Sequence, residues 1–181
     1  MPGAETAGPE EVRRPVRLLL DQIAHNPAYV VGRWLDLLAT NRLADLLLAD
    51  FPRLPQHERN LARQLFRNPA MRTLFQDRRG IAVDAVGFLR MSTGTYPGDP
   101  RATALITELA CHSPEFRKLW SAHHVHRNPH GVRRLRHPRV GPLPLTHESF
   151  ALPGDPGQHL VTYQAEPGSP SEHALRALTA E

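Results

Sequence analysis

Five histidines lie close together in the second half of the chain, and such clusters can bind metal ions. They fall within 15 residues: His123, His124, His126, His130 and His137. In an extended strand, His124 and His126 would share one face, as two metal ligands must. A zinc site needs three or four ligands in a defined geometry, and the sequence has no cysteine pair and no His-Glu-x-x-His pattern. A histidine-dependent metalloenzyme is therefore the weaker hypothesis, and we expect no metal and no cofactor.

Arginines form a second cluster. The densest basic stretch contains Arg127, Arg133, Arg134, Arg136 and Arg139. Guanidinium groups bind phosphates and carboxylates strongly, so this stretch could contact nucleic acid or an acidic ligand. However, the chain has 22 basic residues, all of them arginine apart from Lys118, and its net charge is only +4. This general arginine bias favours the simpler interpretation, an exposed face of a hairpin.

No nucleophile is set in a recognisable catalytic pattern. The sequence has no Gly-x-Ser-x-Gly elbow, no P-loop and no Gly-x-Gly-x-x-Gly motif. Cys111 and His112 are adjacent, but neighbouring residues of a helix point in different directions and do not form a pair. We expect Cys111 to be a small buried residue and the protein not to be an enzyme.

Large apolar side chains indicate a different chemistry, the binding of an apolar molecule. The residues expected to converge between helices and sheet are Phe66, Phe88, Leu109, Phe116, Trp120 and Tyr163. Each alone is explained by an ordinary core, but as a set they could enclose a cavity for an apolar guest. Each methylene taken out of water contributes about 0.8 kcal/mol. A fatty acid would also need an anchor for its carboxylate, for which His123 is the first choice and Arg33 the second.

Helices and strands must position these groups. The spacing of apolar residues predicts a helix that starts near residue 16 and stops at Asn26-Pro27, followed by two short strands within 29–40. These strands are expected to meet at a tight turn near residues 33–36. Asn41 can cap the short helix that follows. Several helices are predicted between residues 61 and 123, and one of them begins at Ser113-Pro114.

The last third of the chain changes in character. Residues 125–163 predict an antiparallel meander of three or four strands, clearest over 157–165. Pro142 and Pro144 favour an edge or irregular position for their segment. Ser169 to Glu172 form a capping box that starts a terminal helix. The order of elements predicts an α+β fold, in which an antiparallel sheet of about five strands carries a central helical layer over one face and a C-terminal helix.

Composition narrows the class of protein. The chain has 181 residues, 40% hydrophobic and 22% charged, which favours one globular domain. It has no apolar run long enough to span a membrane and no secretory signal at its start, and its single cysteine excludes a disulfide framework. We expect a cytoplasmic protein with a flexible leader over 1–15 and a folded domain over 16–181.

Five stretches carry a resemblance to a known family. They are Leu35–Ala44, Glu58–Phe66, Ser113–Trp120, Arg136–Gly141 and a last stretch that runs from Asp155 to Tyr163 and resumes over Ala165–Ser171. Together they resemble the ligand-binding domain of MmyB-like transcription regulators, over roughly residues 16–179. The resemblance implies a PAS-like sensor domain, and fatty-acid-type apolar ligands have been implicated for this family.

Two departures from the family pattern bear on function. The family normally carries an N-terminal helix-turn-helix domain, whereas only about 15 residues precede the shared region here, so we expect contact with DNA only indirectly. The family also tends to have Trp and Asp where this chain has Thr40 and His124. The resulting hypothesis is a regulator's effector-binding domain that binds a small apolar molecule, with a homodimer as a further expected partner. The main alternative is a structural dimerisation or partner-binding module without a ligand.

Overall fold

The computed structural model describes residues 10–48, 53–122 and 128–180. Its first half contains α1 (Arg14–Gln22), β1 (Ala28–Val31), β2 (Leu37–Thr40), α2 (Arg42–Leu47), the 3₁₀ helix η2 (Gln56–Glu58), α3 (Leu61–Arg67) and α4 (Pro69–Leu74). The second half contains α5 (Arg78–Thr95), α6 (Pro100–His112), α7 (Pro114–Ser121), β3 (His130–His137), β4 (Gly141–Ala151), β5 (His159–Gln164) and α8 (Pro170–Thr179). The described helices include none that is both long and apolar enough to cross a bilayer.

The strands form one five-stranded sheet in the order β2-β1-β5-β4-β3, and every neighbouring pair is antiparallel. The pair β1-β2 therefore joins the C-terminal meander through β1 and β5, where Tyr29 lies opposite Val161. Strands from the first and last parts of the chain thus form one sheet, and the helices between them in the sequence pack over it. The predicted α+β fold, with a five-stranded antiparallel sheet and a C-terminal helix, is confirmed.

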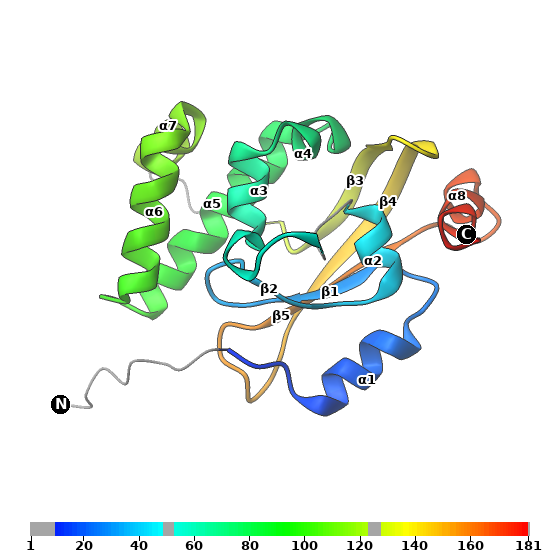
Figure 1. The fold of residues 1–181 in the computed structure, drawn as a ribbon, viewed down its shortest axis with the longest axis horizontal. Helices are drawn as coiled ribbons and strands as arrows, with labels where there is room; N and C mark the ends of the chain where they lie inside the picture. Colours follow the sequence, from blue (N-terminus) through cyan, green and yellow to red (C-terminus); the bar gives the residue numbers. More distant parts are fainter. Residues whose placement is uncertain (1–9, 49–52, 123–127, 181) are drawn as a thin grey trace.

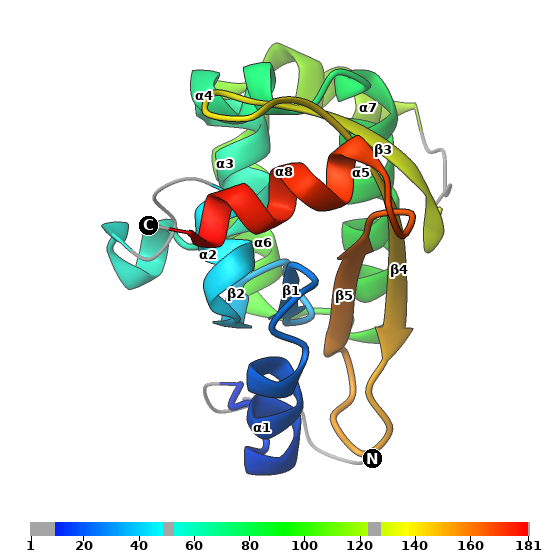
Figure 2. The ribbon, with the colours of Figure 1, turned by 90° about the vertical axis from the view of Figure 1, so that its right-hand side faces the viewer.

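The sheet is covered differently on its two faces. Figure 1 shows helices α3 to α7 on one side of the sheet and α1 on the other, and in Figure 2 helix α8 crosses the molecule beside α2. The large buried cluster contains Leu135, Leu145 and Tyr163 of the sheet together with residues of α2 to α8. A smaller cluster joins Val16 and Leu20 to the opposite face. We call the side of the sheet that packs against the large cluster the helical face, and the side that packs against α1 the α1 face.

The predicted helix starts agree with the structure. Asn41 accepts a hydrogen bond from the backbone N–H of Ala44 at 2.9 Å. Ser113 accepts one from Phe116 at 3.1 Å, and Ser169 one from Glu172 at 3.2 Å. Each side chain satisfies a backbone donor that the first turn of a helix leaves unpaired.

The expectation of an edge position holds for the segment of Pro142 and Pro144 but not for the whole of β4, which lies between β5 and β3. The strand pairs with β5 only from Thr146 onward, so its proline-containing half has a strand neighbour on the β3 side alone. The carbonyl of Arg134, opposite Pro144, accepts instead from the backbone N–H of Gln76. Proline is tolerated here because the N–H that it lacks would point to the side on which β4 has no strand neighbour.

Two further expectations differ from the structure. Cys111 is exposed, not buried. The buried side of α6 carries Ala102, Leu105 and Leu109 at helical spacing, and Cys111 lies off that line. Part of the segment expected to be a flexible leader, residues 1–15, packs against the folded domain. Val12 is buried, and the side chain of Gln158 donates to the carbonyl of Glu11 at 3.0 Å.

His137 predicts a pH dependence of stability. Its Nε2 lies 3.1 Å from the carbonyl oxygen of Leu46, and its Nδ1 accepts from the N–H of Arg139, an arrangement that suits the neutral ring. Burial lowers the pKa of His137, and the charge of Arg139 also lowers it, while the contact with Leu46 raises it. Because the folded state disfavours the protonated ring, its contribution to the free energy of unfolding is complete above pH 6.5 and falls as the pH drops below that value.

We therefore expect the free energy of unfolding of wild type to fall more steeply between pH 7.5 and 5.5 than that of His137→Gln. Urea unfolding at several pH values measures both slopes. His57→Gln, at a side chain that is 76% exposed, should keep the wild-type slope. Equal slopes for wild type and His137→Gln would contradict the assignment.

Candidate ligand-binding site

A cavity of about 140 Å³ lies between α5 and the helical face of the sheet. Helices α3 and α4 and the end of α2 complete its wall. Its apolar lining comprises Val31, Leu35, Leu48, Leu61, Leu65, Met71, Phe75, Ile81, Ala85, Phe88 and Val161, and its polar lining comprises Tyr29, Asp84, Asn128, Arg133, His147, Ser149 and Tyr163. An apolar cavity of about 150 Å³ in a protein stays dry and binds benzene. The cavity therefore suits a guest of that size.

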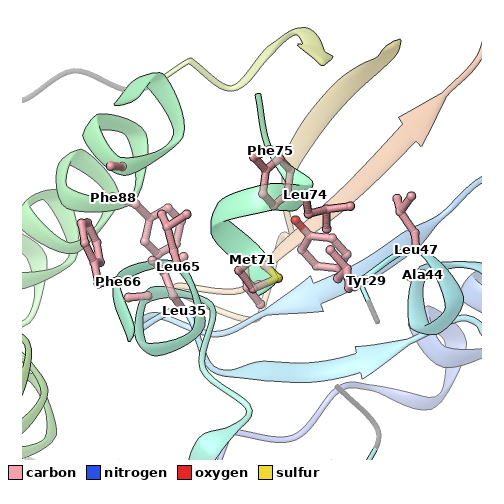
Figure 3. Packing of buried hydrophobic residues seen from close by; sticks show 14 of the residues in the cluster. Tyr29, Leu35, Ala44, Leu47, Leu65, Phe66, Met71, Leu74, Phe75 and Phe88 are labelled. Carbon is pink, nitrogen blue, oxygen red and sulfur yellow. The ribbon is translucent and has the colours of Figure 1, made fainter. Parts of the chain in front are cut away.

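Strand alternation explains how the sheet supplies its part of the wall. Successive residues of a strand point to opposite faces. Tyr29 and Val31 of β1 therefore face the cavity, as Val161 and Tyr163 of β5 do. Figure 3 shows Leu65 and Phe88 close together on one side and Met71, Phe75 and Tyr29 on the other. Helices α3, α4 and α5 and strands β1 and β5 thus border the same space.

Leu35 reaches the cavity through an uncommon backbone conformation. Its φ is 64°, the left-handed region that side chains other than glycine rarely adopt. Asn60 holds the turn: its Nδ2 donates to the carbonyl of Trp34 at 2.8 Å and to Asp36 at 3.0 Å. The N–H of Leu61 donates to the carbonyl of Leu35 at 2.8 Å. These bonds fix the conformation that keeps the Leu35 side chain in the cavity wall.

One end of the cavity is polar. Arg133 forms an ion pair with Asp84, and the two side chains are only 11% and 12% exposed. The other carboxylate oxygen of Asp84 accepts from the backbone N–H of Asn128 at 2.9 Å. His147 has Nδ1 at 2.9 Å from the carbonyl of Gly131 and Nε2 at 3.1 Å from that of Asn128. The charges at this end are therefore paired within the protein.

Two tyrosine hydroxyls lie near this polar end. The oxygens of Tyr29 and Tyr163 are 3.3 Å apart. Burial raises the pKa of Tyr29 well above its usual value, and the neighbouring Tyr163 raises it further. Burial also raises the pKa of Tyr163. Both hydroxyls stay protonated, and because only one proton lies between the two oxygens, the second can be donated to a guest.

A groove of about 320 Å³ adjoins the cavity and shares Leu48 and Met71 with it. Its remaining lining is Asn68, Ala70, Thr73, Leu74, Arg136 and Pro138. Methionine is flexible and repacks easily. The flexible side chain of Met71 therefore borders both spaces.

This arrangement, an apolar cavity between a helical layer and an antiparallel sheet, is one expected of a small-molecule binding domain. A family model described as the MmyB-like transcription regulator ligand binding domain matches residues 12–178 of the 181. The chain belongs to this family. No curated protein matches it. The resemblance found in the sequence is confirmed, and the protein is a ligand-binding domain of the transcription-regulator type.

Two of the predicted site residues line the cavity of this ligand-binding domain. Phe88 of α5 lies in the helical part of the cavity wall, and Tyr163 of β5 lies in the part that the sheet forms. The other predicted aromatic residues and Leu109 are not among the residues that line the cavity. Phe66 contacts Phe116 edge-on with ring centroids 5.1 Å apart, and Phe116 stacks on Trp120 with ring centroids 5.6 Å apart. Phe66, Leu109 and Phe116 are fully buried core residues. Their expected contact with a ligand finds no support in the lining of the cavity.

The two predicted carboxylate anchors have different outcomes. Arg33 does not line the cavity: it forms an ion pair with Glu10 at 3.3 Å, and its guanidinium lies 4.6 Å from the ring centre of Tyr96. His123 lies outside the described residues, as do His124, His126 and Arg127. Among the described residues, no group of three or more His, Cys, Asp or Glu is placed to hold a metal ion.

The polar end of the site was not predicted from the sequence. The expected exposed hairpin face holds for Arg134 and Arg136 but not for Arg133, which is buried. A signal was present: along β3, Arg133 alternates in phase with Leu135 and His137, which face the core. Asp84 similarly follows the helical spacing of Ile81 and Phe88.

Proposed function

We propose that this domain binds a small apolar molecule in the cavity between α5 and the sheet, and that an acyl chain of the fatty-acid type is its ligand. The observation that supports this is the cavity itself, whose lining is mostly apolar with polar groups gathered at one end. Sites for small molecules have this composition, because the apolar wall supplies affinity and a few polar groups set orientation. Each buried methylene would contribute about 0.8 kcal/mol.

The role would be binding rather than catalysis, in a PAS-like sensor of the cytoplasm that acts on DNA only through another part or partner. Tyr29, Tyr163, Asp84 and Arg133 are engaged with one another or with the backbone, an arrangement that suits orientation of a guest. A structural dimerisation module without a ligand is the competing hypothesis. It predicts that the cavity has no affinity for any guest.

Strand β1 offers a route by which a bound ligand could influence the rest of a regulator. Tyr29 and Val31 face the cavity, while Ala28 and Val30 on the other side of the strand pack with Val16 and Leu20 of α1. A ligand shifts a conformational equilibrium only as far as it binds one state better. A packing of β1 preferred by the liganded domain would therefore reposition α1, near the end where the family carries its DNA-binding part.

Benzene tests the proposal because it matches the cavity in size and has no head group. We expect saturable changes in the ¹H–¹⁵N NMR signals of cavity residues such as Phe88, Val161 and Tyr163, and little change at exposed positions such as Met91. A purely structural module would give only small shifts that rise linearly with benzene concentration. That result would contradict the proposed function.

A further inference from the structure

We infer that the cavity selects a ligand whose polar head group is neutral, such as an amide, ester or alcohol, over a carboxylate anion with the same chain. The inference rests on the proposed function and narrows it: the acyl chain would carry a neutral head group, so the anion of a free fatty acid would not be the preferred ligand. It depends on how the charges at the polar end of the cavity are already paired.

Among the described residues that line the cavity, the one arginine is Arg133, and its guanidinium already forms an ion pair with Asp84. The pair is nearly buried, and the backbone N–H of Asn128 fixes the second oxygen of Asp84 at 2.9 Å. A ligand carboxylate beside Arg133 would therefore be the second anion facing one guanidinium. Two carboxylates in such a place repel each other, and burial increases the cost of the unmatched charge.

The other polar groups favour hydrogen bonding without charge. A neutral imidazole has one N–H donor and one acceptor nitrogen. The Nδ1 of His147 lies 2.9 Å from the carbonyl oxygen of Gly131, and its Nε2 lies 3.5 Å from Nη2 of Arg133, which suits an Nδ1–H donor and an Nε2 acceptor and leaves no ring donor for a ligand. Tyr29 and Tyr163 keep their protons and can give one hydrogen bond and accept others. A neutral carbonyl or hydroxyl group gains these bonds without adding a charge to the cavity.

Hexanamide and hexanoate provide a direct comparison, since they differ mainly in the charge of the head group. Both are titrated into the full chain at pH 8, where an ordinary imidazole is neutral, and binding is followed by NMR. We expect wild type to bind hexanamide at least tenfold more tightly than hexanoate. The wild-type comparison stands even if a variant fails to fold.

Asp84→Asn tests the cause of the preference. It removes the carboxylate that neutralises Arg133, so the preference for hexanamide should fall at least tenfold or reverse. Glu115→Gln is the matched control, because it removes the same charge from the pair between Arg78 and Glu115, away from the cavity lining. The control should keep the wild-type preference.

The outcomes separate the inference from the proposed function. If wild type binds hexanoate as tightly as hexanamide or more tightly, or if Asp84→Asn folds and keeps the wild-type preference, the inference is wrong and the apolar site stands. If neither hexyl compound binds although benzene does, the inference is also wrong. If benzene fails to bind as well, the proposed function itself fails.

Discussion

Ala85→Phe is expected to abolish binding of benzene and hexanamide, with a loss of at least 100-fold in affinity. Ala85 lies on α5, is only half-buried and lines the cavity. A phenyl group in a space of about 140 Å³ would occupy the volume that a benzene-sized guest requires. Because the added group enters existing space, the free energy of unfolding should change by less than about 1.5 kcal/mol, the range of well-tolerated core substitutions.

The matched control for this substitution is Met91→Phe on the same helix, where the native side chain is 42% exposed. It adds an aromatic ring to α5 outside the cavity and should leave both affinities unchanged. Binding is measured by NMR titration and stability by urea unfolding. An Ala85→Phe variant that is stable and still binds benzene with wild-type affinity would show that the guest lies elsewhere.

Asn41→Ala is expected to cost about 4 kcal/mol in the free energy of unfolding. Asn41 is 4% exposed. Its Oδ1 accepts from the N–H groups of Ala28 and Ala44, and its Nδ2 donates to the carbonyls of Ile23 and Asn26, each of the latter at 2.8 Å. Alanine would leave four backbone groups without this partner, and a buried group left unpaired costs about 1–3 kcal/mol.

Asn68→Ala separates this role from ordinary helix capping. Asn68 also caps a helix, accepting from Ala70 at 2.9 Å, and its Nδ2 donates to the side chain of Gln64 at 2.7 Å, but it bonds only within α3 and α4 and its position is only half-buried. Loss of such a cap costs about 1 kcal/mol. Urea unfolding of both variants gives the comparison, and equal losses would mean that Asn41 acts as a cap alone and does not join α1, β1 and α2.

The signals that predicted the fold were local. Asn41, Ser113 and Ser169 were identified as helix starts because each acts within a few residues of itself in the chain. The pairing of β1 with β5 joins segments more than 100 residues apart, and the order of elements was enough to suggest that the two groups of strands share a sheet. The exact register was not predictable, since it depends on side chains that meet only in the folded state.

The site was only partly predictable for the same reason. Phe88 and Tyr163 were found because large apolar residues at regular spacing face the interior. Trp120 has the same character, yet it stacks on Phe116 and lies under the guanidinium of Arg90, 4.3 Å from its ring centre. Hydrophobicity alone does not distinguish a residue that fills the core from one that borders a cavity. The pair of Asp84 with Arg133 joins residues of α5 and β3, a partnership that spacing along the chain does not reveal.

The most direct test of the central claim is a crystal structure of the wild-type protein under xenon pressure, because xenon enters empty apolar cavities without needing a head group. We expect xenon density between Phe88, Val161 and Tyr163, and its loss in Ala85→Phe. A wild-type structure in which side chains fill this space and no xenon binds would contradict the account.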